Sequence, residues 1–480
     1  MQRNEATETQ GEPVESPQLK LVDGVRERRA REKALRGEIM ERVRELAALK
    51  TTAAPFSPGR SMVRYAARVY GEQEMVNLVD SALEFWLTAG RYHSRLEKGL
   101  ARWYGVPQVK LVNSGSSANL LATASLTSHV WGDRRLRPGD EVITVAAGFP
   151  TTVAPMIQMG LVPVFVDIEL PSYNINPALL EQALSPKTRA IMLAHTLGNP
   201  FDLDAVCAFC REHDLWLIED NCDASGSLYK GQLTGTFGDL ATLSFYPPHH
   251  MTTGEGGAVL CRTDELARVA ESFRDWGRDC WCRPGADNTC GKRFCQQMGA
   301  LPEGYDHKYT YSHLGFNLKI TDMQAAVGCA QLERLGAFGD KRRENWAWLR
   351  AALADLEDVL VLPEPTPGSD PSWFGFMITV RPDAPFHRRD LVRHLEASRV
   401  QTRMLFGGNL LRQPALTELW ADREAQGMPA PWRVASGLEV TDQVMDAGFW
   451  IGVYPGMQEE ELAWMCDRIR GFARGTEGER

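Results

Sequence analysis

The sequence predicts an α/β protein in which helices cover a mainly parallel sheet, with a smaller α+β domain at the C-terminal end. From about residue 110, short apolar runs alternate with amphipathic segments, and this alternation stops near residue 335. The length of 480 residues also suits two domains better than one core. We therefore expect ligands to bind beyond the carboxyl ends of the strands of the large domain.

The chain divides into three segments. Residues 1–23 are polar and acidic with two prolines, a composition typical of a disordered tail. We assign residues 24–335 to N-terminal helices and the large domain, and residues 336–480 to the small domain. After the tail, apolar residues at helical spacing among charges predict an amphipathic helix packed on the main body. These residues are Val25, Leu35, Ile39, Val43 and Leu46.

Five short apolar runs predict strands, several of them apolar on both faces, as in a buried parallel sheet. Helical segments at 177–184 and 202–213 lie between them. The small domain is predicted to contain a long helix at 336–355, a Pro-rich connector, a strand at 374–380 and a helix at 387–398. The five predicted strands are 141–145, 162–168, 189–195, 215–220 and 241–246.

Charge and composition exclude several classes of protein. The formal charge of -9 provides no basic surface for nucleic acid. No apolar run reaches the roughly 18 residues of a membrane span, and the N-terminus has no signal-peptide pattern. Ten cysteines are too few for a secreted disulfide scaffold of this length. We expect a cytoplasmic protein that binds neither nucleic acid nor membranes.

Two polar segments follow predicted strands. A Gly/Ser turn leads into a helix near Ser116, where the backbone amides of Gly115 and Ser116 suit a phosphate ester. Alone, such a turn is more often a simple helix cap. Asp220 ends a buried strand, where its carboxylate needs a cation such as a protonated pyridine nitrogen, or else caps the next turn.

Four segments, SFYPPHHMTTGEGGAVL (244–260), PTTVAP (150–155), GNP (198–200) and LGFNLKITDMQAA (314–326), resemble the DegT/DnrJ/EryC1 sugar aminotransferase family. The resemblance covers roughly residues 60–475 and implies a fold-type I pyridoxal phosphate enzyme. In that family a lysine that binds the cofactor covalently stands where this chain has His249. In this respect the chain resembles the sugar 3-dehydrases, which also have a histidine at this position. In those enzymes pyridoxamine phosphate is held without a covalent bond and the imidazole acts as the base.

The resemblance also implies roles for other residues. Asn317 is similar to the family residue that reaches the phosphate of the neighbouring subunit, which implies a homodimer. Asp223 and Tyr246 are candidates for tuning the base His249, whereas we expect His250 to be structural. Six residues are similar to those that contact the pyridine ring, its nitrogen or the phosphate of the cofactor: Phe149, Asp220, Ser244, Gly115, Ser116 and Asn317.

Four cysteines have the spacing C-x57-C-x-C-x7-C: Cys222, Cys280, Cys282 and Cys290. The last three lie in a loop without apolar periodicity, and four thiolates hold either zinc or an iron–sulfur cluster. The spacing is similar to that of the CDP-4-keto-6-deoxyglucose 3-dehydrase, which implies a [2Fe-2S] cluster near the cofactor. Cys295 is an alternative ligand to Cys290, and we expect the other five cysteines to join the core.

The resemblance implies removal of the C3 hydroxyl from a nucleotide-linked 4-keto-6-deoxyhexose. The first expectation is a CDP-linked sugar of 3,6-dideoxyhexose and lipopolysaccharide O-antigen biosynthesis, with electrons from a flavin/iron–sulfur reductase or a ferredoxin. The alternatives are a dTDP-linked sugar of a secondary-metabolite pathway and an ordinary 4-aminotransferase that uses another lysine, such as Lys230. A dehydrase without electron transfer and a catalytically silent scaffold or zinc-binding regulator are the remaining alternatives.

Overall fold

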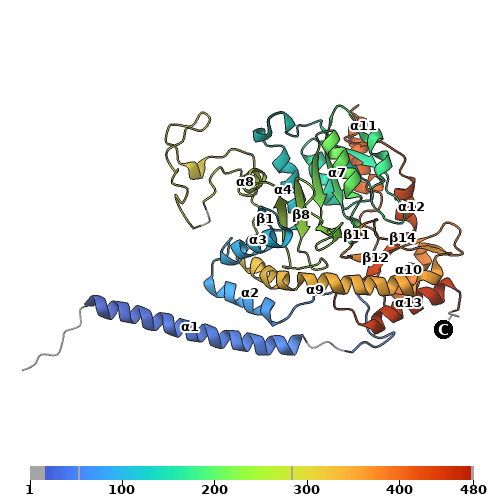
Figure 1. Ribbon diagram of the computed structural model, residues 1–480, viewed down its shortest axis with the longest axis horizontal. Helices are drawn as coiled ribbons and strands as arrows, with labels where there is room; N and C mark the ends of the chain where they lie inside the picture. Colours follow the sequence, from blue (N-terminus) through green and yellow to red (C-terminus); the bar gives the residue numbers. More distant parts are fainter. Residues whose placement is uncertain (1–16, 52–54, 283–284, 477–480) are drawn as a thin grey trace, which may run out of the picture.

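An eight-stranded sheet forms the centre of the computed structural model, which describes residues 17–51, 55–282 and 285–476 (Figure 1). The strand order is β1-β9-β8-β5-β4-β2-β3-β13. Neighbouring strands from β8 to β13 are parallel, whereas β9 runs antiparallel to β1 and β8. The strands are β1 (Gln108–Val112), β2 (Glu141–Val145), β3 (Val162–Val166), β4 (Thr188–Ala194), β5 (Trp216–Asp220), β8 (Leu240–Ser244), β9 (Gly257–Cys261) and β13 (Arg433–Val434).

The structure confirms the predicted α/β fold and the five predicted strands, which are β2, β3, β4, β5 and β8. Successive side chains of a central strand face opposite layers, since Ile191 packs in the core beside α7 and Met192 in the core beside α4 and α8. Both faces of the sheet are therefore buried. The helices of the large domain are α4 (Gly115–Leu126), α5 (Pro150–Gln158), α6 (Leu180–Ala183), α7 (Leu203–Glu212) and α8 (Asp264–Arg274).

The C-terminal part builds a second core around an antiparallel sheet in the order β10-β12-β14. Its strands are β10 (Leu360–Val361), β12 (Gly375–Val380) and β14 (Gly448–Gly452). Its helices are α10 (Arg388–Ala397), α11 (Pro414–Ala425), α12 (Glu439–Ala447) and α13 (Glu459–Ala473). A third small sheet contains β11 (Ser369–Asp370), β6 (Leu228–Tyr229) and β7 (Gln232–Leu233).

The predicted boundary at residue 335 falls inside a helix. Helix α9 (Asp322–Ala352) begins well before the predicted 336–355 because Thr321 and Gln324 form a capping box at its start. In addition, β13 comes from the C-terminal segment and pairs with β3 of the large sheet. Helix α9 thus runs continuously from one predicted domain into the other. The C-terminal segment also contributes β13 to the sheet of the large domain.

Three helices precede the sheet: α1 (Pro17–Lys50), α2 (Glu72–Glu84) and α3 (Arg91–Tyr104). Helix α1 begins within the predicted 1–23 tail, of which residues 1–16 lie outside the described part. It lies beside α2, with Met40 and Ala47 buried. The helix packs on the main body through α2, as predicted, although Leu35 and Ile39 of its apolar stripe are exposed. Within the described residues, no helix is long and apolar enough to cross a membrane.

Candidate active site

A cavity of about 520 Å³ opens beyond the ends of β5 and β8 and is closed on its far side by Phe374, Arg403 and Trp450 of the C-terminal part. Its position agrees with the expectation that ligands bind at the carboxyl ends of parallel strands. Most of the predicted site residues line this one cavity: Gly115, Ser116, Phe149, Asp220, Cys222, Asp223, Ser244, Tyr246 and His249.

The N-terminus of α4 forms one wall of the cavity. Ser114 caps the helix by accepting a hydrogen bond from the backbone amide of Ser117 at 3.0 Å. A Cβ atom on Gly115 would lie 2.5 Å from the Cβ of Ser244, so only glycine lets the two segments approach this closely. The first amides of α4 and the Ser244 hydroxyl thus form a cradle suited to a phosphate group.

Asp220 is buried at the last position of β5. Its carboxylate accepts hydrogen bonds from Asn119 Nδ2 at 2.8 Å, Thr152 Oγ1 at 2.7 Å and Thr242 Oγ1 at 3.3 Å. These donors orient the carboxylate but are all uncharged, and no cation among the described residues forms an ion pair with it. The sequence did not predict the three donors, although Asn119 lies one turn after Ser116 on α4 and Thr152 belongs to the PTTVAP segment.

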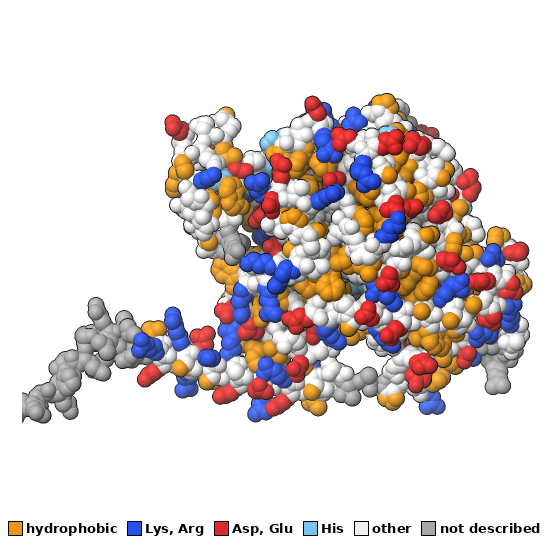
Figure 2. Space-filling view, in the orientation of Figure 1, with side chains coloured by type: hydrophobic (Ala, Val, Ile, Leu, Met, Phe, Trp, Pro, Cys, Tyr) orange, Lys and Arg blue, Asp and Glu red, His pale blue; other side chains and the backbone are white. Residues whose placement is uncertain are grey.

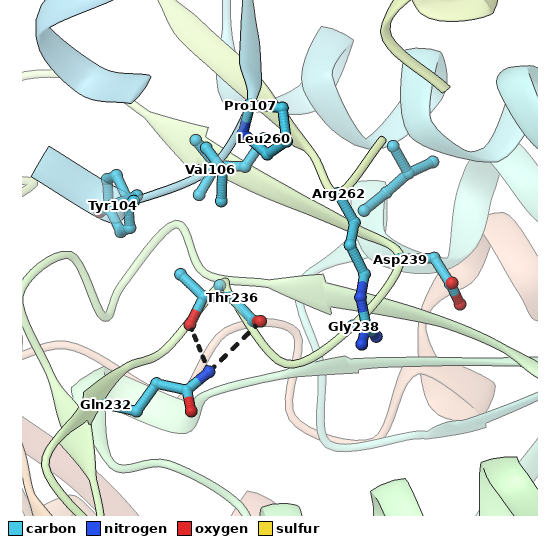
Figure 3. Close-up of a pocket in the computed structure, with 12 residues that line it drawn as sticks. Tyr104, Val106, Pro107, Gln232, Thr236, Gly238, Asp239, Leu260 and Arg262 are labelled. Atoms are coloured by element: carbon cyan, nitrogen blue, oxygen red, sulfur yellow. Dashed lines mark hydrogen bonds between the residues drawn. The ribbon is translucent and has the colours of Figure 1, made fainter. Parts of the chain in front are cut away.

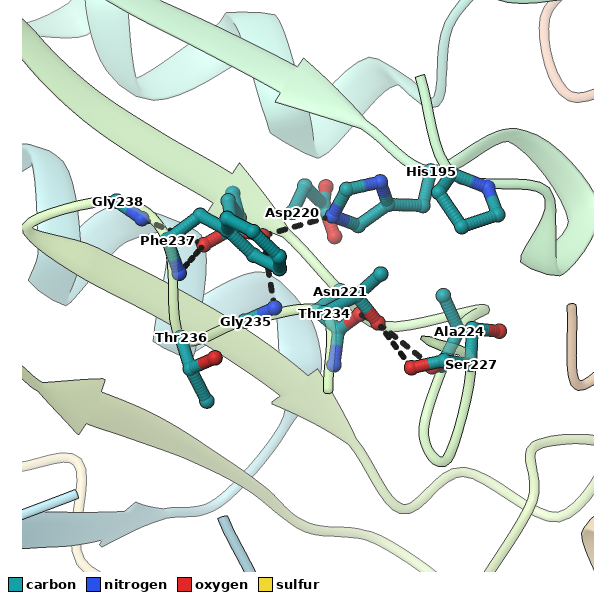
Figure 4. Close-up of polar contacts among 12 residues, drawn as sticks. His195, Asp220, Asn221, Ala224, Ser227, Thr234, Gly235, Thr236, Phe237 and Gly238 are labelled. Atoms are coloured by element: carbon teal, nitrogen blue, oxygen red, sulfur yellow. Dashed lines mark hydrogen bonds and ion pairs between the residues drawn. The ribbon is translucent and has the colours of Figure 1, made fainter. Parts of the chain in front are cut away.

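The neighbouring residue Glu219 binds His195 and the segment from Gly235 to Gly238, which Figure 4 shows beside Asp220. It is fully buried and accepts hydrogen bonds from the backbone amides of Gly235 and Gly238, each at 2.7 Å. Its carboxylate also lies 3.0 Å from Nε2 of the buried His195, which follows β4. The loop after β7 is therefore fastened to β5 directly beside Asp220.

His249 lies on the cavity wall with Asp223 behind it. Its Nδ1 is 3.3 Å from Oδ1 of Asp223, and its ring packs on Phe374 with centroids 5.1 Å apart. Burial raises the pKa of Asp223, and the facing imidazole only partly opposes this shift. Because a carboxylate faces Nδ1, the second ring nitrogen, Nε2, is the one left to exchange protons in the cavity.

Arg342 of α9 is a site residue that the sequence did not predict. It is buried, and its guanidinium donates to the carbonyls of Pro248 and His249 at 3.2 and 3.4 Å. It also donates to the carbonyls of Trp373 and Phe374 at 3.1 and 3.3 Å. Burial lowers its pKa to about 10, so it remains charged at neutral pH. One cation thus joins the His249 turn to the segment that carries Phe374.

His250 points away from the cavity. It is buried, its Nε2 donates to the carbonyl of Ser372 at 2.7 Å, and burial lowers its pKa well below the ordinary value. This neutral side chain ties two segments together, which agrees with the structural role expected from the sequence. No lysine is among the described residues that line the cavity. Lys230 is exposed and forms an ion pair with Asp204.

Asn317 does not join the cavity of its own chain. Its side chain is exposed, and its Oδ1 accepts a hydrogen bond from Lys319 Nζ at 2.8 Å. Leu314 beside it is 96% exposed. The predicted phosphate contact therefore requires a second chain.

Three of the four predicted cluster cysteines, Cys280, Cys282 and Cys290, lie close enough in one loop to interact with one another, whereas Cys222 does not join them. Cys222 lines the main cavity, whereas Cys280 and Cys282 line a separate cavity of about 1290 Å³. Cys290 lies in the same loop as these two, which projects from the large domain between α8 and α9 (Figure 1). The described residues contain no group of three or more His, Cys, Asp or Glu side chains placed to hold a metal ion.

The other cysteines have ordinary environments. Cys207 is half-buried on α7, and Cys295 is exposed. The remaining four are buried, as predicted: Cys210, Cys261, Cys329 and Cys466.

A further cavity of about 390 Å³ lies at the opposite end of β8 (Figure 3). Its polar groups include Asp239, Arg262 and Gln232, and the Gln232 amide donates to Thr236 Oγ1 at 2.9 Å. It contains none of the predicted site residues, so the chemistry is concentrated in the cavity at the strand ends.

The fold and the strand-end cavity define the chain as a fold-type I, pyridoxal phosphate-dependent aminotransferase-like protein. The chain belongs to the DegT/DnrJ/EryC1/StrS aminotransferase family, whose model matches residues 69–470. This confirms the family resemblance seen in the sequence.

Two curated relatives match along most of their length. The lipopolysaccharide biosynthesis protein RfbH of Salmonella typhimurium is 52% identical over 438 residues, covering 91% of this chain and 98% of that protein. The dTDP-4-dehydro-2,6-dideoxy-D-glucose 3-dehydratase of Saccharopolyspora spinosa is 54% identical over 417 residues, covering 87% and 88%. Both alignments extend across the two predicted domains.

Solved structures include a variant of GDP-4-keto-6-deoxymannose-3-dehydratase with bound GDP-perosamine. It superposes with a TM-score of 0.75 at 26% identity, over 85% of this chain and all of that one. The E. coli GDP-4-keto-6-deoxy-D-mannose-3-dehydratase with bound hydrated PLP has a TM-score of 0.74 at 25% identity, over 85% of this chain and all of that one.

Proposed function

We propose that this protein removes the C3 hydroxyl from a nucleotide-linked 4-keto-6-deoxyhexose, using pyridoxamine phosphate bound without a covalent bond. The proposal rests on the position of His249. Its imidazole faces the Asp223 carboxylate on the wall of a cavity that no described lysine lines. The named 3-dehydratases among its relatives support the reaction class.

The relatives favour dTDP as the nucleotide over the CDP predicted first from the sequence. The 54% identical relative is a dTDP-sugar 3-dehydratase by name, and neither curated relative described above is named for a CDP-sugar. The relative named for lipopolysaccharide biosynthesis supports a role in polysaccharide sugar synthesis. We propose a dTDP-linked substrate and keep CDP as the competing substrate in the test below.

The residues of the cavity fit pyridoxamine phosphate. The cradle of Gly115, Ser116 and Ser244 would hold its phosphate, and the unpaired charge of Asp220 would hold its protonated ring nitrogen. Phe149, 48% exposed, presents a ring for stacking. When bound, the cofactor supplies an amine that condenses with the C4 ketone and a ring that withdraws electrons.

His249 moves the protons in this proposal. With Nδ1 facing Asp223, Nε2 is free to accept a proton from C4′ of the cofactor. The imidazolium formed is stabilised by the Asp223 carboxylate, and it can return the proton to the departing C3 hydroxyl. Arg342 donates a hydrogen bond to the His249 carbonyl and so holds the backbone of His249 in place. Tyr246, half-exposed on the same wall, remains a candidate for tuning the base His249.

Arg403 supplies a positive charge where the C-terminal part meets the cavity. Its guanidinium stacks over the Tyr65 ring at 3.8 Å, and Nη1 donates to the Thr402 carbonyl at 2.7 Å. A guanidinium fixed in this way retains donors for an anionic group. We propose that Arg403 binds the diphosphate of the nucleotide sugar.

The iron–sulfur cluster does not fit the arrangement of the cysteines. Burial opposes ionisation of Cys282, but a hydrogen bond from Thr289 Oγ1 at 3.1 Å and other donors lower its pKa to about 7. This favours a thiolate, yet Cys222 lies on the wall of a different cavity. We derive no step through a cluster, and the reductase or ferredoxin partner stays a prediction of the sequence.

The site is proposed to be completed by a homodimer in the cytoplasm. Asn317 and the almost fully exposed Leu314 lie on the surface, away from the cavity of their own chain. In a dimer, Asn317 would reach the phosphate cradle of the partner, as the family resemblance implies.

Turnover tests the function directly. Anaerobic protein loaded with pyridoxamine phosphate is incubated with dTDP- or CDP-4-keto-6-deoxyglucose and a reductase, and the products are identified by NMR. We expect loss of the C3 oxygen, faster with the dTDP sugar, and no loss with His249→Asn. A 4-amino sugar formed with glutamate, with C3 unchanged, would instead support an aminotransferase.

A further inference from the structure

Lys319 contacts Asn317, the side chain proposed above to enter the site of a second chain. The Nζ atom of Lys319 donates a hydrogen bond to Asn317 Oδ1 at 2.8 Å. Its side chain is only 10% exposed, whereas lysine side chains are rarely buried unless they are paired. Burial of the charge is unfavourable, so this contact has a cost that a freely solvated lysine would not have.

Two neighbouring residues hold the ammonium of Lys319 in place. Nζ lies 3.6 Å from the centre of the Trp276 ring and 3.6 Å from Oδ1 of Asp275. The buried Arg274 fixes the Asp275 carboxylate in turn, since its Nε donates to Oδ1 at 2.9 Å. Burial lowers the pKa of Lys319, and the Asp275 carboxylate opposes this shift and so favours the protonated form. The ammonium is therefore fixed beside Asn317.

The backbone of Asn317 is also fixed. Asn317 and Asp275 form an antiparallel bridge, and the Leu318 amide donates to the Arg274 carbonyl at 3.1 Å. On the other side, the amide of Asn113, which follows β1, donates to the Leu318 carbonyl at 2.8 Å. Because the backbone is held on both sides, the main freedom left to Asn317 is rotation of its side-chain amide.

The hydrogen bond from Lys319 selects one orientation of this amide. An ammonium group only donates, so it faces the oxygen of the amide and not the nitrogen. The Nδ2 group, which carries two N–H donors, then lies on the side away from Lys319. A phosphate ester accepts hydrogen bonds, so it binds Nδ2 and is repelled by Oδ1. Without Lys319 the amide of Asn317 would be free to present either end.

We propose that Lys319 is a positioning residue, which turns the amide of Asn317 so that Nδ2 donates to the cofactor phosphate held by the partner subunit. The inference rests on the proposed homodimer with shared sites. It assigns to Lys319 an effect that passes through Asn317, without a contact between Lys319 and the cofactor.

Cofactor binding tests the proposal whether or not the chain removes a hydroxyl. The dissociation constant for pyridoxamine phosphate is measured by absorbance titration of the full chain. Lys319→Met keeps an apolar side chain on Trp276 but removes the donors. We expect the dissociation constant to rise about tenfold, as for loss of one hydrogen bond to a charged group. Lys319→Arg retains donors and should bind nearly as tightly as the wild type.

A control separates loss of the hydrogen bond from loss of a positive charge. The surface over α3 carries several basic side chains, which Figure 2 shows gathered on this face. Lys98→Met removes the same charge as Lys319→Met, at an exposed position of α3. Its dissociation constant for the cofactor is expected to equal that of the wild type.

A double-mutant cycle shows whether Lys319 acts through Asn317. Asn317→Ala should weaken cofactor binding, and Lys319→Met added to it should weaken binding no further. Wild-type affinity in Asn317→Ala would remove the shared site and this inference with it. If Asn317→Ala binds weakly, wild-type affinity in Lys319→Met, or additive losses in the double variant, would overturn the inference alone. So would a Lys319→Met chain that sediments as a monomer while the wild type is a dimer.

Discussion

Two adjacent histidines on one turn have opposite environments. His249 lies on the cavity wall with a carboxylate behind it, whereas His250 is enclosed and bonded to a backbone carbonyl. A base for proton transfer needs access to solvent or substrate and a partner that stabilises its charged form. Only His249 meets both conditions, and His250 instead contributes to stability.

His250 makes stability depend on pH. Its folded pKa is depressed by burial, so between that value and about 6.5 the unfolded chain binds a proton that the folded chain does not. The free energy of unfolding should fall as the pH drops below about 6.5, by up to about 1.4 kcal/mol per pH unit from this group. Urea unfolding at pH 7 and pH 5 measures this loss. We expect a smaller loss in His250→Gln, and an equal loss would contradict the assignment.

Arg342 should act on catalysis without touching substrate. Its guanidinium spans carbonyls of two segments, and an ammonium cannot reproduce that fork. Arg342→Lys should lower kcat of the proposed dehydration at least about tenfold with little change in KM, because the His249 turn is less well fixed. Lys341→Met, at a half-exposed position of α9, is the control. Unchanged kcat and pH profile in Arg342→Lys would remove its positioning role.

Among the elements, the sheet was predictable and its connections were not. Runs such as 215–220 are apolar on both faces, which only a buried parallel strand requires, and Asp220 stood out as a carboxylate at the end of one. Arg342 and the donors to Asp220 carry no such local signal, because their partners are up to 101 residues away in the sequence. The helix α1 was predicted, but the face through which it packs was not, because periodicity shows that a stripe exists but not what covers it.

The start of α4 sets cofactor affinity in this account. Gly115→Ala would push a methyl group to 2.5 Å from the Cβ of Ser244 and displace the phosphate cradle. We expect the dissociation constant for pyridoxamine phosphate to rise at least about tenfold, measured by absorbance titration. Gly24→Ala, whose Cβ meets nothing within 4 Å, is the control. Equal affinity of the two variants would contradict a phosphate site at α4.

The loop between α8 and α9 decides whether the cluster predicted from the sequence forms. That prediction requires iron and acid-labile sulfide in equal amounts in anaerobically purified protein, with loss of both in Cys280→Ser. The described arrangement leaves Cys222 on another cavity wall, so Cys222→Ser should not change the metal content. Protein without iron would rule out the cluster and leave the proposed dehydration without its predicted electron path.

In the whole molecule, residues of both domains line the cavity, and in our proposal a second chain completes it. Phe374 and Arg403 come from the C-terminal part, and Arg342 joins that part to the His249 turn. The sequence predicted two domains but not that β13 and α9 would tie them together.

Sharing of sites between chains predicts complementation. Asn317→Ala and His249→Asn should each be inactive or nearly so as homodimers. Mixed under conditions that exchange subunits, they should regain up to about a quarter of wild-type activity, since one site of each hybrid then has both residues intact. The activity of the mixture measures this, and no recovery despite subunit exchange would place Asn317 outside the site.

The account depends most on a cofactor that no side chain tethers and that His249 deprotonates. Release of tritium from C4′-labelled pyridoxamine phosphate, in the presence of the keto sugar, tests both points when followed by borohydride reduction and intact-mass analysis. We predict tritium release by the wild type, at least about a thousandfold less by His249→Asn, and an unmodified chain mass in both. A chain heavier by one reduced cofactor, or tritium release retained in His249→Asn, would contradict the account.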